Sequence, residues 1–177
     1  MRLIRDIRYM EPTDRGATAA IGNFDGVHLG HQAVLKVAAA AAQAPLGVVT
    51  FEPHPRAYFA PERAPFRLMN AEARAHRLET LGVAVLYELA FNEALAGISP
   101  ADFVRDVLVG RLGLAHVTVG RDFRFGKDRA GDVLTLTALA EEHGLGVTVA
   151  DLVETGGVEV SSTRIRTALS EGRPEDA

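Results

Sequence analysis

The segment Gly22–His31, with the sequence GNFDGVHLGH, holds the residues of this chain best suited to phosphate chemistry. Its glycines allow tight turns and close approach of the backbone to a ligand. His28 and His31 are three residues apart, so on a helix their imidazoles would face the same side. Small apolar residues precede the segment at 18–21, and strong helix formers follow it at 33–42. We therefore expect the motif where a strand passes into a helix.

Such a position attracts anions, because the first amide groups of a helix lack internal partners and carry the positive end of the helix dipole. A triphosphate is the expected guest, with His28 and His31 directed at one of its phosphates. Two other interpretations remain open: the histidines could be surface residues or a metal pair. Because the chain has no Cys, a metal would need further carboxylates or histidines, and the other histidines are His54, His76, His116 and His143.

Composition limits the possible functions. A chain of 177 residues with 47% hydrophobic residues fits one domain with a real core. Its 19 basic and 23 acidic residues are well mixed and give a net charge of −4, which argues against binding to nucleic acid or to an anionic membrane. The lack of Cys excludes a disulfide scaffold and a thiol nucleophile. A charged N-terminus, and no charge-free apolar run of about 18 residues, lead us to expect a cytoplasmic protein.

Short apolar runs alternate with helical patterns along the chain. The runs that predict strands are 17–21, 47–51, 83–89, 116–120 and 146–150. The best-marked helix is Pro100–Leu112, with Ser99 as its N-cap, Asp102 in its first turn and Gly113 after its end. This alternation predicts an α/β fold with a mostly parallel sheet and helices on both faces.

Polar segments follow several of these strands directly. Asn23 comes after the first strand, Glu52–Pro55 after the second and Arg121–Gly126 after the fourth, while Ser161–Thr163 opens the last helix. Parallel sheets bind ligands beyond the carboxyl ends of their strands. We therefore expect these segments to meet in one site.

The exit of the second strand is stiffened by two prolines, Pro53 and Pro55, which present His54 rigidly. The segment could equally be a simple turn. Nearby, Phe59 and Phe66 could form an apolar wall beside a ligand or belong to the core.

Two further segments carry candidate ligand groups. Residues 122–131 alternate aromatic and charged side chains between glycines, which fits a mobile flap over an aromatic ring or an edge β-ribbon. In Ser161–Arg166 the hydroxyls could cap a helix or bind phosphate. Arg164 and Arg166 point to nearly opposite faces, so only one guanidinium could face a ligand; the alternative is an ordinary capped basic helix.

Together these blocks resemble a known family. They are GNFDGVHLGH at 22–31, TFEPHP at 50–55, FN at 91–92, GRDFRFGK at 120–127 and SSTRIR at 161–166. In this order they resemble the adenylyltransferase module of bacterial bifunctional riboflavin kinase/FAD synthetases, over residues 17–170. The His-x-Gly-His element alone is shared across the nucleotidylyltransferase superfamily. The resemblance implies a Rossmann-like nucleotidylyltransferase fold.

The resemblance also implies a reaction: ATP and FMN give FAD and pyrophosphate, with Mg²⁺, when the FMN phosphate attacks the α-phosphorus of ATP. His28 and His31 would be catalytic. ATP would be bound by Gly22, Asn23, Phe24, Asp25, Gly30, Ser162, Thr163 and Arg166, with Arg166 on the β- and γ-phosphates and Arg164 in solvent. The flavin would contact His54, Pro55, Asp122, Phe123, Arg124 and Phe125, with Asp122 and Phe125 foremost. No residues are assigned to the metal.

We expect one FMN adenylyltransferase domain at 1–170, followed by a polar tail or severed linker at 171–177. Members of the family usually continue into a riboflavin kinase domain, which this sequence lacks. We therefore expect it to adenylylate FMN but not to phosphorylate riboflavin, so no ADP should form from ATP and riboflavin. The segment 69–74 matches the family only loosely, and its role stays open.

Other functions remain as alternatives. Within the superfamily, a cytidylyltransferase or a pantetheine-phosphate adenylyltransferase would act on a different phosphate, and a panel of acceptors would separate these enzymes. A nucleotide- or flavin-binding module without turnover would bind ATP or FMN yet form no FAD. A nucleic-acid module would need a basic stripe, which the sequence does not contain.

Overall fold

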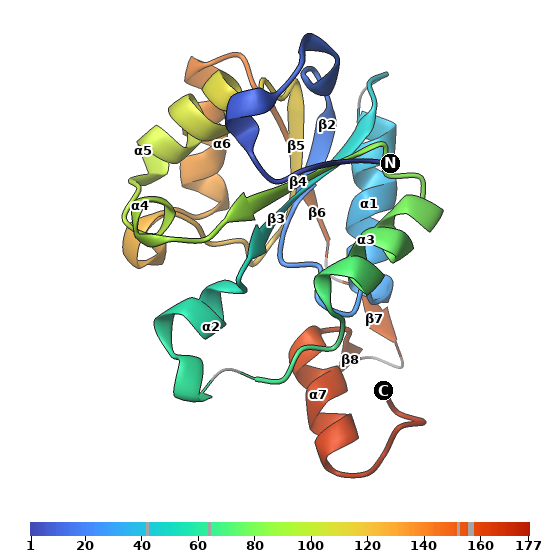
Figure 1. Cartoon of the computed structure of the whole chain (residues 1–177). Coiled ribbons are helices and arrows are strands. Elements are labelled where there is room, and N and C mark those ends of the chain that lie inside the picture. Colours follow the sequence, from blue (N-terminus) through green and yellow to red (C-terminus); the bar gives the residue numbers. More distant parts are fainter. Residues whose placement is uncertain (42, 64, 152, 156–157) are drawn as a thin grey trace.

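A computed structural model describes residues 1–41, 43–63, 65–151, 153–155 and 158–177. Its centre is a six-stranded sheet in the order β1-β4-β3-β2-β5-β6, with every neighbouring pair parallel (Figure 1). The strands are β1 Arg2–Ile4, β2 Thr18–Ile21, β3 Leu46–Glu52, β4 Val85–Ala90, β5 His116–Gly120 and β6 Gly146–Ala150. The parallel α/β prediction is confirmed. The bounds of β5 and β6 agree with the sequence patterns, whereas β1 was not predicted.

The strand order places a topological switch at β2. From β2 the chain proceeds through β3 to β4 on one side, and then returns to β5 on the other side of β2. Ala20 accordingly lies opposite Val48 of β3 and Thr118 of β5. In open α/β sheets, ligands bind outside the carboxyl ends of the strands at such a switch. The segment 22–31 leaves the sheet at this point.

Helices cover both faces of the sheet, as predicted (Figure 1). On one face α1 (Leu29–Ala41) and α3 (Ala71–Thr80) pack over a core that includes Ala20. On the other face α6 (Val133–Glu142) and the helical segment after residue 100 pack over a core that includes Ala19. Successive strand residues point to opposite faces, so β2 supplies both cores with small side chains.

The predicted α-helix Pro100–Leu112 is present but is mostly of another type. It starts as α5 (Pro100–Asp102) and continues as a π-helix, η4, over Phe103–Arg111. The amide of Leu112 donates to the carbonyl of Val107, five residues back. The correction has a physical reason: the buried residues Phe103, Val104, Val107 and Leu108 are spaced i, i+1, i+4 and i+5, which lie on one face of either helix type, so their spacing cannot distinguish the two. Long π segments are rare.

The remaining elements connect or extend this frame. They are η1 Ile7–Tyr9, η2 Pro12–Asp14, α2 Pro55–Phe59, η3 Pro61–Arg63, α4 Glu93–Ala96, η5 Lys127–Arg129, the antiparallel pair β7 Glu154–Thr155 and β8 Val158–Glu159, and α7 Ser162–Ser170. Helix α7 lies beyond the carboxyl edge of the sheet (Figure 1), and residues 171–177 after it are exposed. Among the described residues no helix is both long and apolar enough to cross a membrane.

The packing of the core on the η4 face predicts that two leucines contribute differently to the free energy of unfolding. Leu108 is fully buried on η4, whereas Leu134 on α6 is 79% exposed. We expect Leu108→Ala to lower the free energy of unfolding by about 2–5 kcal/mol, because it leaves a cavity. The matched variant Leu134→Ala should change it by less than about 0.5 kcal/mol. Urea denaturation followed by circular dichroism measures both, and equal effects would contradict the described packing.

Candidate active site at the carboxyl edge of the sheet

The loop between β2 and α1 is held in a strained conformation. Phe24 and Val27 have positive φ angles of 51° and 40°, which side-chain-bearing residues rarely adopt, and Gly26 has φ 85°. A Cβ added at Gly26 would lie 2.8 Å from the Leu68 side chain. The side chains of Phe24 and Val27 are buried in the α1/α3 core and hold this conformation. The Phe24 ring, expected at the ATP site, is therefore a core group.

The loop delivers the two imidazoles to the start of α1 as a pair. The rings of His28 and His31 stack with centroids 3.7 Å apart. The amide of His31 donates to Nδ1 of His28 at 3.4 Å, so a neutral His28 carries its proton on Nε2. A Cβ on Gly30 would lie 3.1 Å from the His28 ring and 3.2 Å from the carbonyl oxygen of Val160. Glycine at the third position of His-x-Gly-His therefore leaves room for this close packing.

Both histidines are held neutral at neutral pH. Burial lowers the pKa of His28. Burial, and next the neighbouring His28, lower the pKa of His31 to about 3. An approaching phosphate would favour the protonated form and raise both values. The pair thus offers neutral imidazoles in the ligand-free protein.

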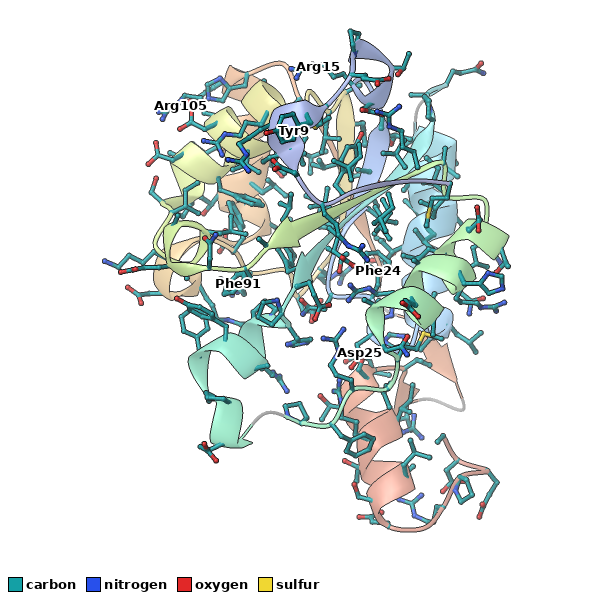
Figure 2. The ribbon with its side chains drawn as sticks, in the orientation of Figure 1. Tyr9, Arg15, Phe24, Asp25, Phe91 and Arg105 are labelled. Carbon is teal, nitrogen blue, oxygen red and sulfur yellow. The ribbon has the colours of Figure 1, made fainter. Side chains whose placement is uncertain are left out.

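Asp25 ties the loop to two distant segments (Figure 2). Its carboxylate is buried and accepts hydrogen bonds from the amides of Leu68 and Met69, both at 3.0 Å. It also forms an ion pair with Arg166 of α7. Burial opposes ionisation of Asp25, but the two amides and the guanidinium outweigh it, so its pKa is lowered. Asp25 therefore acts as a structural anchor in the ligand-free protein.

Helix α7 docks onto the same loop through its first turns. Ser161 caps the helix by accepting from the amide of Arg164 at 3.3 Å. The hydroxyl of Ser162 donates to the carbonyl of Asp25 at 2.8 Å. These contacts set the start of α7 beside the start of α1. Arg164 is exposed, as expected.

Arg166 is more constrained than its expected phosphate role suggests. It is 8% exposed, its Nε donates to the carbonyl of Phe66 at 2.8 Å, and its Nη2 contacts Asp25. Among the described residues, Nη1 makes no hydrogen bond. A cavity of about 370 Å³ is lined by Arg166, Thr163 and Arg56 among others. Arg166 thus borders this cavity, and within the described part of the chain Nη1 is its guanidinium nitrogen without a hydrogen bond.

A buried guanidinium that sequence reasoning missed supports the loop from beneath. Arg74 of α3 is fully buried between Glu52 (3.0 Å) and Glu88 (2.8 Å), and its Nη1 lies 3.4 Å from the carbonyl of Asn23. The only sequence signal for this position is an arginine four residues before Leu78, on the apolar face of α3. The open role of segment 69–74 is thus at least partly structural.

A second missed arginine lies between the strand end and the loop. Arg67 forms a two-pronged contact with Glu52, at 3.2 and 3.4 Å, and its Nε is 3.7 Å from Asp25. Its side chain is 27% exposed. Alternating charges therefore run from Glu52 through Arg67 to Asp25 along this edge of the sheet.

His54 and Pro55 occupy the start of α2. Nδ1 of His54 accepts from the amide of Arg56 at 3.0 Å and caps the helix that begins at Pro55. Burial, and next the charge of Arg67, lower the pKa of His54 to about 4. The ring is therefore neutral at neutral pH, and its Nε2 carries the proton.

The aromatic residues near His54 are open to solvent. Phe59 is 65% exposed and Phe66 is 50% exposed, so neither belongs to the core. Phe59 and Tyr58 of α2 meet Phe91 edge to face, with centroids 5.7 and 5.4 Å away (Figure 2). This leaves the apolar-wall interpretation of Phe59 and Phe66 standing.

The segment after β5 contains a short antiparallel bridge, as in the β-ribbon interpretation. Phe125 and Gly131 exchange backbone hydrogen bonds at 3.0 and 2.9 Å. Phe125 is buried against Phe103 and stacks on Phe123. Phe125, expected as a foremost flavin contact, thus lies in the core, whereas Phe123 is half-buried.

The polar residues of this ribbon face solvent. Asp122 and Arg124 are exposed, and Arg124 pairs with Asp132 at 3.2 Å. Since β5 is the neighbour of β2, the ribbon begins at the same sheet edge as the loop. Within the described ranges, no hydrogen bond or ion pair joins it to the histidine pair. In the same ranges, no group of three or more His, Cys, Asp or Glu side chains could hold a metal ion.

The chain as a whole is similar to proteins of a known family. Residues 10–164 match the family model described as FAD synthetase. The chain belongs to the FAD synthetase family. A bifunctional riboflavin kinase/FMN adenylyltransferase from Pseudomonas fluorescens is 45% identical over 96% of this chain and 55% of that protein. Its counterpart from Escherichia coli K12 is 37% identical over 97% and 56%. The chain thus spans about half the length of these curated relatives.

Solved structures agree on the fold of this FAD synthetase family member. A macrolide-efflux protein from Streptococcus pneumoniae superimposes with a TM-score of 0.82 at 27% identity, over 97% of this chain and 58% of that one. A pantothenate synthetase from Thermus thermophilus superimposes with a TM-score of 0.60 at 15% identity, over 99% and 71%. This second similarity concerns the fold alone, and it agrees with an α/β architecture built on a parallel sheet.

The contacts of Asp25 predict that two arginines of α7 contribute differently to the free energy of unfolding. Arg166→Met leaves the buried Asp25 carboxylate without its cation, which should lower the free energy of unfolding by about 3 kcal/mol. Arg164→Met, on the exposed face of the same helix, should change it by less than about 0.5 kcal/mol. Urea denaturation at pH 7 gives both values. If Arg166→Met is as stable as the wild type, the ion pair with Arg166 does not help to anchor Asp25.

The low pKa of His31 predicts a pH dependence of stability. In the folded protein His31 stays neutral down to about pH 3, whereas in the unfolded chain it binds a proton below about pH 6.5. Between these values the unfolded state binds more protons, so the free energy of unfolding falls as the pH falls, by about 1.4 kcal/mol per pH unit from this group.

His31→Gln should therefore flatten the decline in stability between pH 6 and pH 4. His76→Gln, an exposed change on α3, is the matched control and should keep the wild-type slope. Urea midpoints measured at half-unit steps test this. A slope unchanged in His31→Gln would show that the ring is already protonated, or solvated, in the folded state.

Proposed function

We propose that this chain transfers the AMP part of ATP to FMN and releases FAD and pyrophosphate. An oxygen of the FMN phosphate forms a bond to the α-phosphorus, and the bond from that phosphorus to the bridging oxygen of the β-phosphate breaks. The observation that carries the proposal is the stacked pair His28 and His31 at the first turn of α1, at the switch point of the sheet. Membership of the FAD synthetase family supports it.

The histidines act on the α-phosphate in this proposal. The Nε2–H of His28 donates to a nonbridging oxygen, and the adjacent His31 strengthens the local positive potential once phosphate charge favours protonation. Their contribution grows as negative charge builds on the phosphate oxygens in the transition state. No residue acts as a nucleophile, so positioning and charge stabilisation supply the catalysis.

The rest of ATP follows the backbone of the loop and the start of α7. In this proposal, the amides of the loop and of the first turn of α1 that are not already bonded within the protein donate to the anion. Thr163 and Arg166 border the cavity that would take the β- and γ-phosphates, and Ser162 lies beside it in the first turn of α7. The Asn23 carbonyl and the Asp25 carboxylate act indirectly, because both are already bonded to protein groups.

The flavin is proposed to lie across the ends of β3 and β5. His54 and Pro55 border it on one side, and Asp122, Phe123 and Arg124 border it on the other. Exposed Phe59 is an additional candidate for the apolar wall. This side of the proposal depends on the neighbouring positions of β3, β2 and β5 in the sheet.

The side chains in the described ranges do not form a metal cage, so we propose that Mg²⁺ arrives with the phosphates of ATP. The relatives are named riboflavin kinase as well as FMN adenylyltransferase, and this chain covers about half of them. We propose that it carries their adenylyltransferase half and that riboflavin kinase activity belongs to the other half.

The function is tested by incubating the chain with ATP, Mg²⁺ and FMN and identifying the flavin product by chromatography. FAD and pyrophosphate should form in equal amounts. His28→Ala and His31→Ala should each lower kcat by about 100-fold or more while changing the KM for ATP much less, because the interaction is strongest in the transition state. His76→Ala is the matched control and should retain wild-type turnover.

Acceptor choice separates this function from its alternatives. The wild-type chain is offered FMN, riboflavin, pantetheine phosphate and, with CTP, other phosphate acceptors. Turnover with FMN alone supports the proposal. Preference for a non-flavin phosphate would agree with a nucleotidylyltransferase but refute FMN as its acceptor. Binding of ATP and FMN without FAD formation would indicate a non-catalytic module.

A further inference from the structure

Arg67 is the cation that lies between the two halves of the proposed site. It comes from the segment before α3, and its guanidinium touches Glu52 at the end of β3 and approaches Asp25 in the β2–α1 loop. Glu52 leads directly into His54 and α2. Arg67 therefore stands between the segment proposed for the flavin and the segment proposed for ATP.

Two other arginines near this junction are held more firmly than Arg67. Arg166 is buried against Asp25 and the Phe66 carbonyl, and Arg74 is fully buried between two glutamates. The histidines of the loop are neutral before ligand binds. Of these groups, Arg67 combines a fixed positive charge with access to solvent.

The bonds that hold Arg67 are weak enough to be exchanged. Its contacts to Glu52, at 3.2 and 3.4 Å, are longer than strong charge-assisted hydrogen bonds, which measure about 2.7–2.9 Å. Its Nε is buried and has no hydrogen-bond partner among the described residues; the nearest carboxylate oxygen, on Asp25, is 3.7 Å away. A phosphate oxygen could accept a hydrogen bond from this Nε and compete with Glu52 for the two terminal nitrogens of the guanidinium.

We propose that Arg67 binds the phosphate of the acceptor and holds it in line with the α-phosphorus of ATP. The inference rests on the proposed function, because that reaction brings two anionic phosphate groups into contact. Their repulsion must be offset at the point where they meet, which is where the flavin segment adjoins the ATP loop. A guanidinium suits this task, since its planar fork can donate two hydrogen bonds to one phosphate.

The position of His54 supports the same geometry independently. Among its neighbours, Arg67 is the strongest charge acting to lower the pKa of this ring. The positive field of Arg67 therefore extends over the start of α2, on the flavin side. A phosphate arriving there would be attracted before it reaches the histidine pair.

The test compares two flavins that differ only in the phosphate. Binding of FMN, of riboflavin and of ATP is measured by isothermal titration calorimetry for wild type, Arg67→Gln, Arg67→Lys and the control Arg77→Gln, which removes an exposed arginine from α3. In Arg67→Gln we expect FMN affinity to fall about 10-fold or more, while riboflavin and ATP affinities stay within about twofold. Arg67→Lys should recover part of the loss, and Arg77→Gln should match wild type.

Steady-state kinetics give a second readout. Arg67→Gln should raise the KM for FMN by about the same factor as the dissociation constant, and it should leave the KM for ATP within about twofold. Thermal unfolding of each variant checks that the fold is kept.

Each other outcome overturns the inference. Equal loss of FMN and riboflavin would make Arg67 a shaping residue of the pocket, and loss of ATP alone would assign it to the nucleotide. Wild-type FMN affinity in Arg67→Gln would exclude phosphate contact while leaving the proposed function intact. A wild-type chain that binds no FMN and forms no FAD would instead refute the function itself, and the inference with it.

Discussion

A single buried carboxylate, that of Asp25, fixes how the site is assembled. It can stay ionised in the interior only because two amides and a guanidinium satisfy it, and these come from residues 68–69 and from Arg166, which is 141 positions away in sequence. The cost of leaving a buried charge unpaired makes these contacts nearly obligatory. The start of α1, the segment before α3 and helix α7 are thus held against one another before any ligand arrives.

The same edge of the sheet contains more charge than a structural core needs. Arg74 is enclosed by Glu52 and Glu88, and Glu88 also binds Arg5 from the β1 side. Buried ion pairs rarely add much stability compared with apolar residues of the same size. Their effect here is to set positions: Arg74 reaches the carbonyl of Asn23 and so supports the strained loop at its first turn. Precise placement of backbone amides is what phosphate binding requires.

How much of this arrangement the sequence predicts depends on whether a feature is set by neighbouring residues or by residues far apart in the chain. β5 and β6 were predicted to the residue because an apolar run between turn residues is a local pattern, while three-residue β1 is too short to produce one. Phe125 shows what the alternation of aromatic and charged residues cannot predict. The pattern separates the two faces of a ribbon, but it does not say which face packs against the core. The bond between Asp25 and Arg166 is set by tertiary packing, so no local spacing reveals it.

The histidine pair shows how burial and charge can be combined in one site. Two stacked imidazoles that were both protonated would repel each other, and burial would penalise each charge further. Their lowered pKa values avoid both costs in the ligand-free protein. An anionic ligand at this pair would favour the protonated form. Arg67, Arg74 and Arg166, by contrast, carry permanent charges that lie against carboxylates. In the ligand-free protein these cations are therefore balanced by protein groups, whereas the two imidazoles stay neutral.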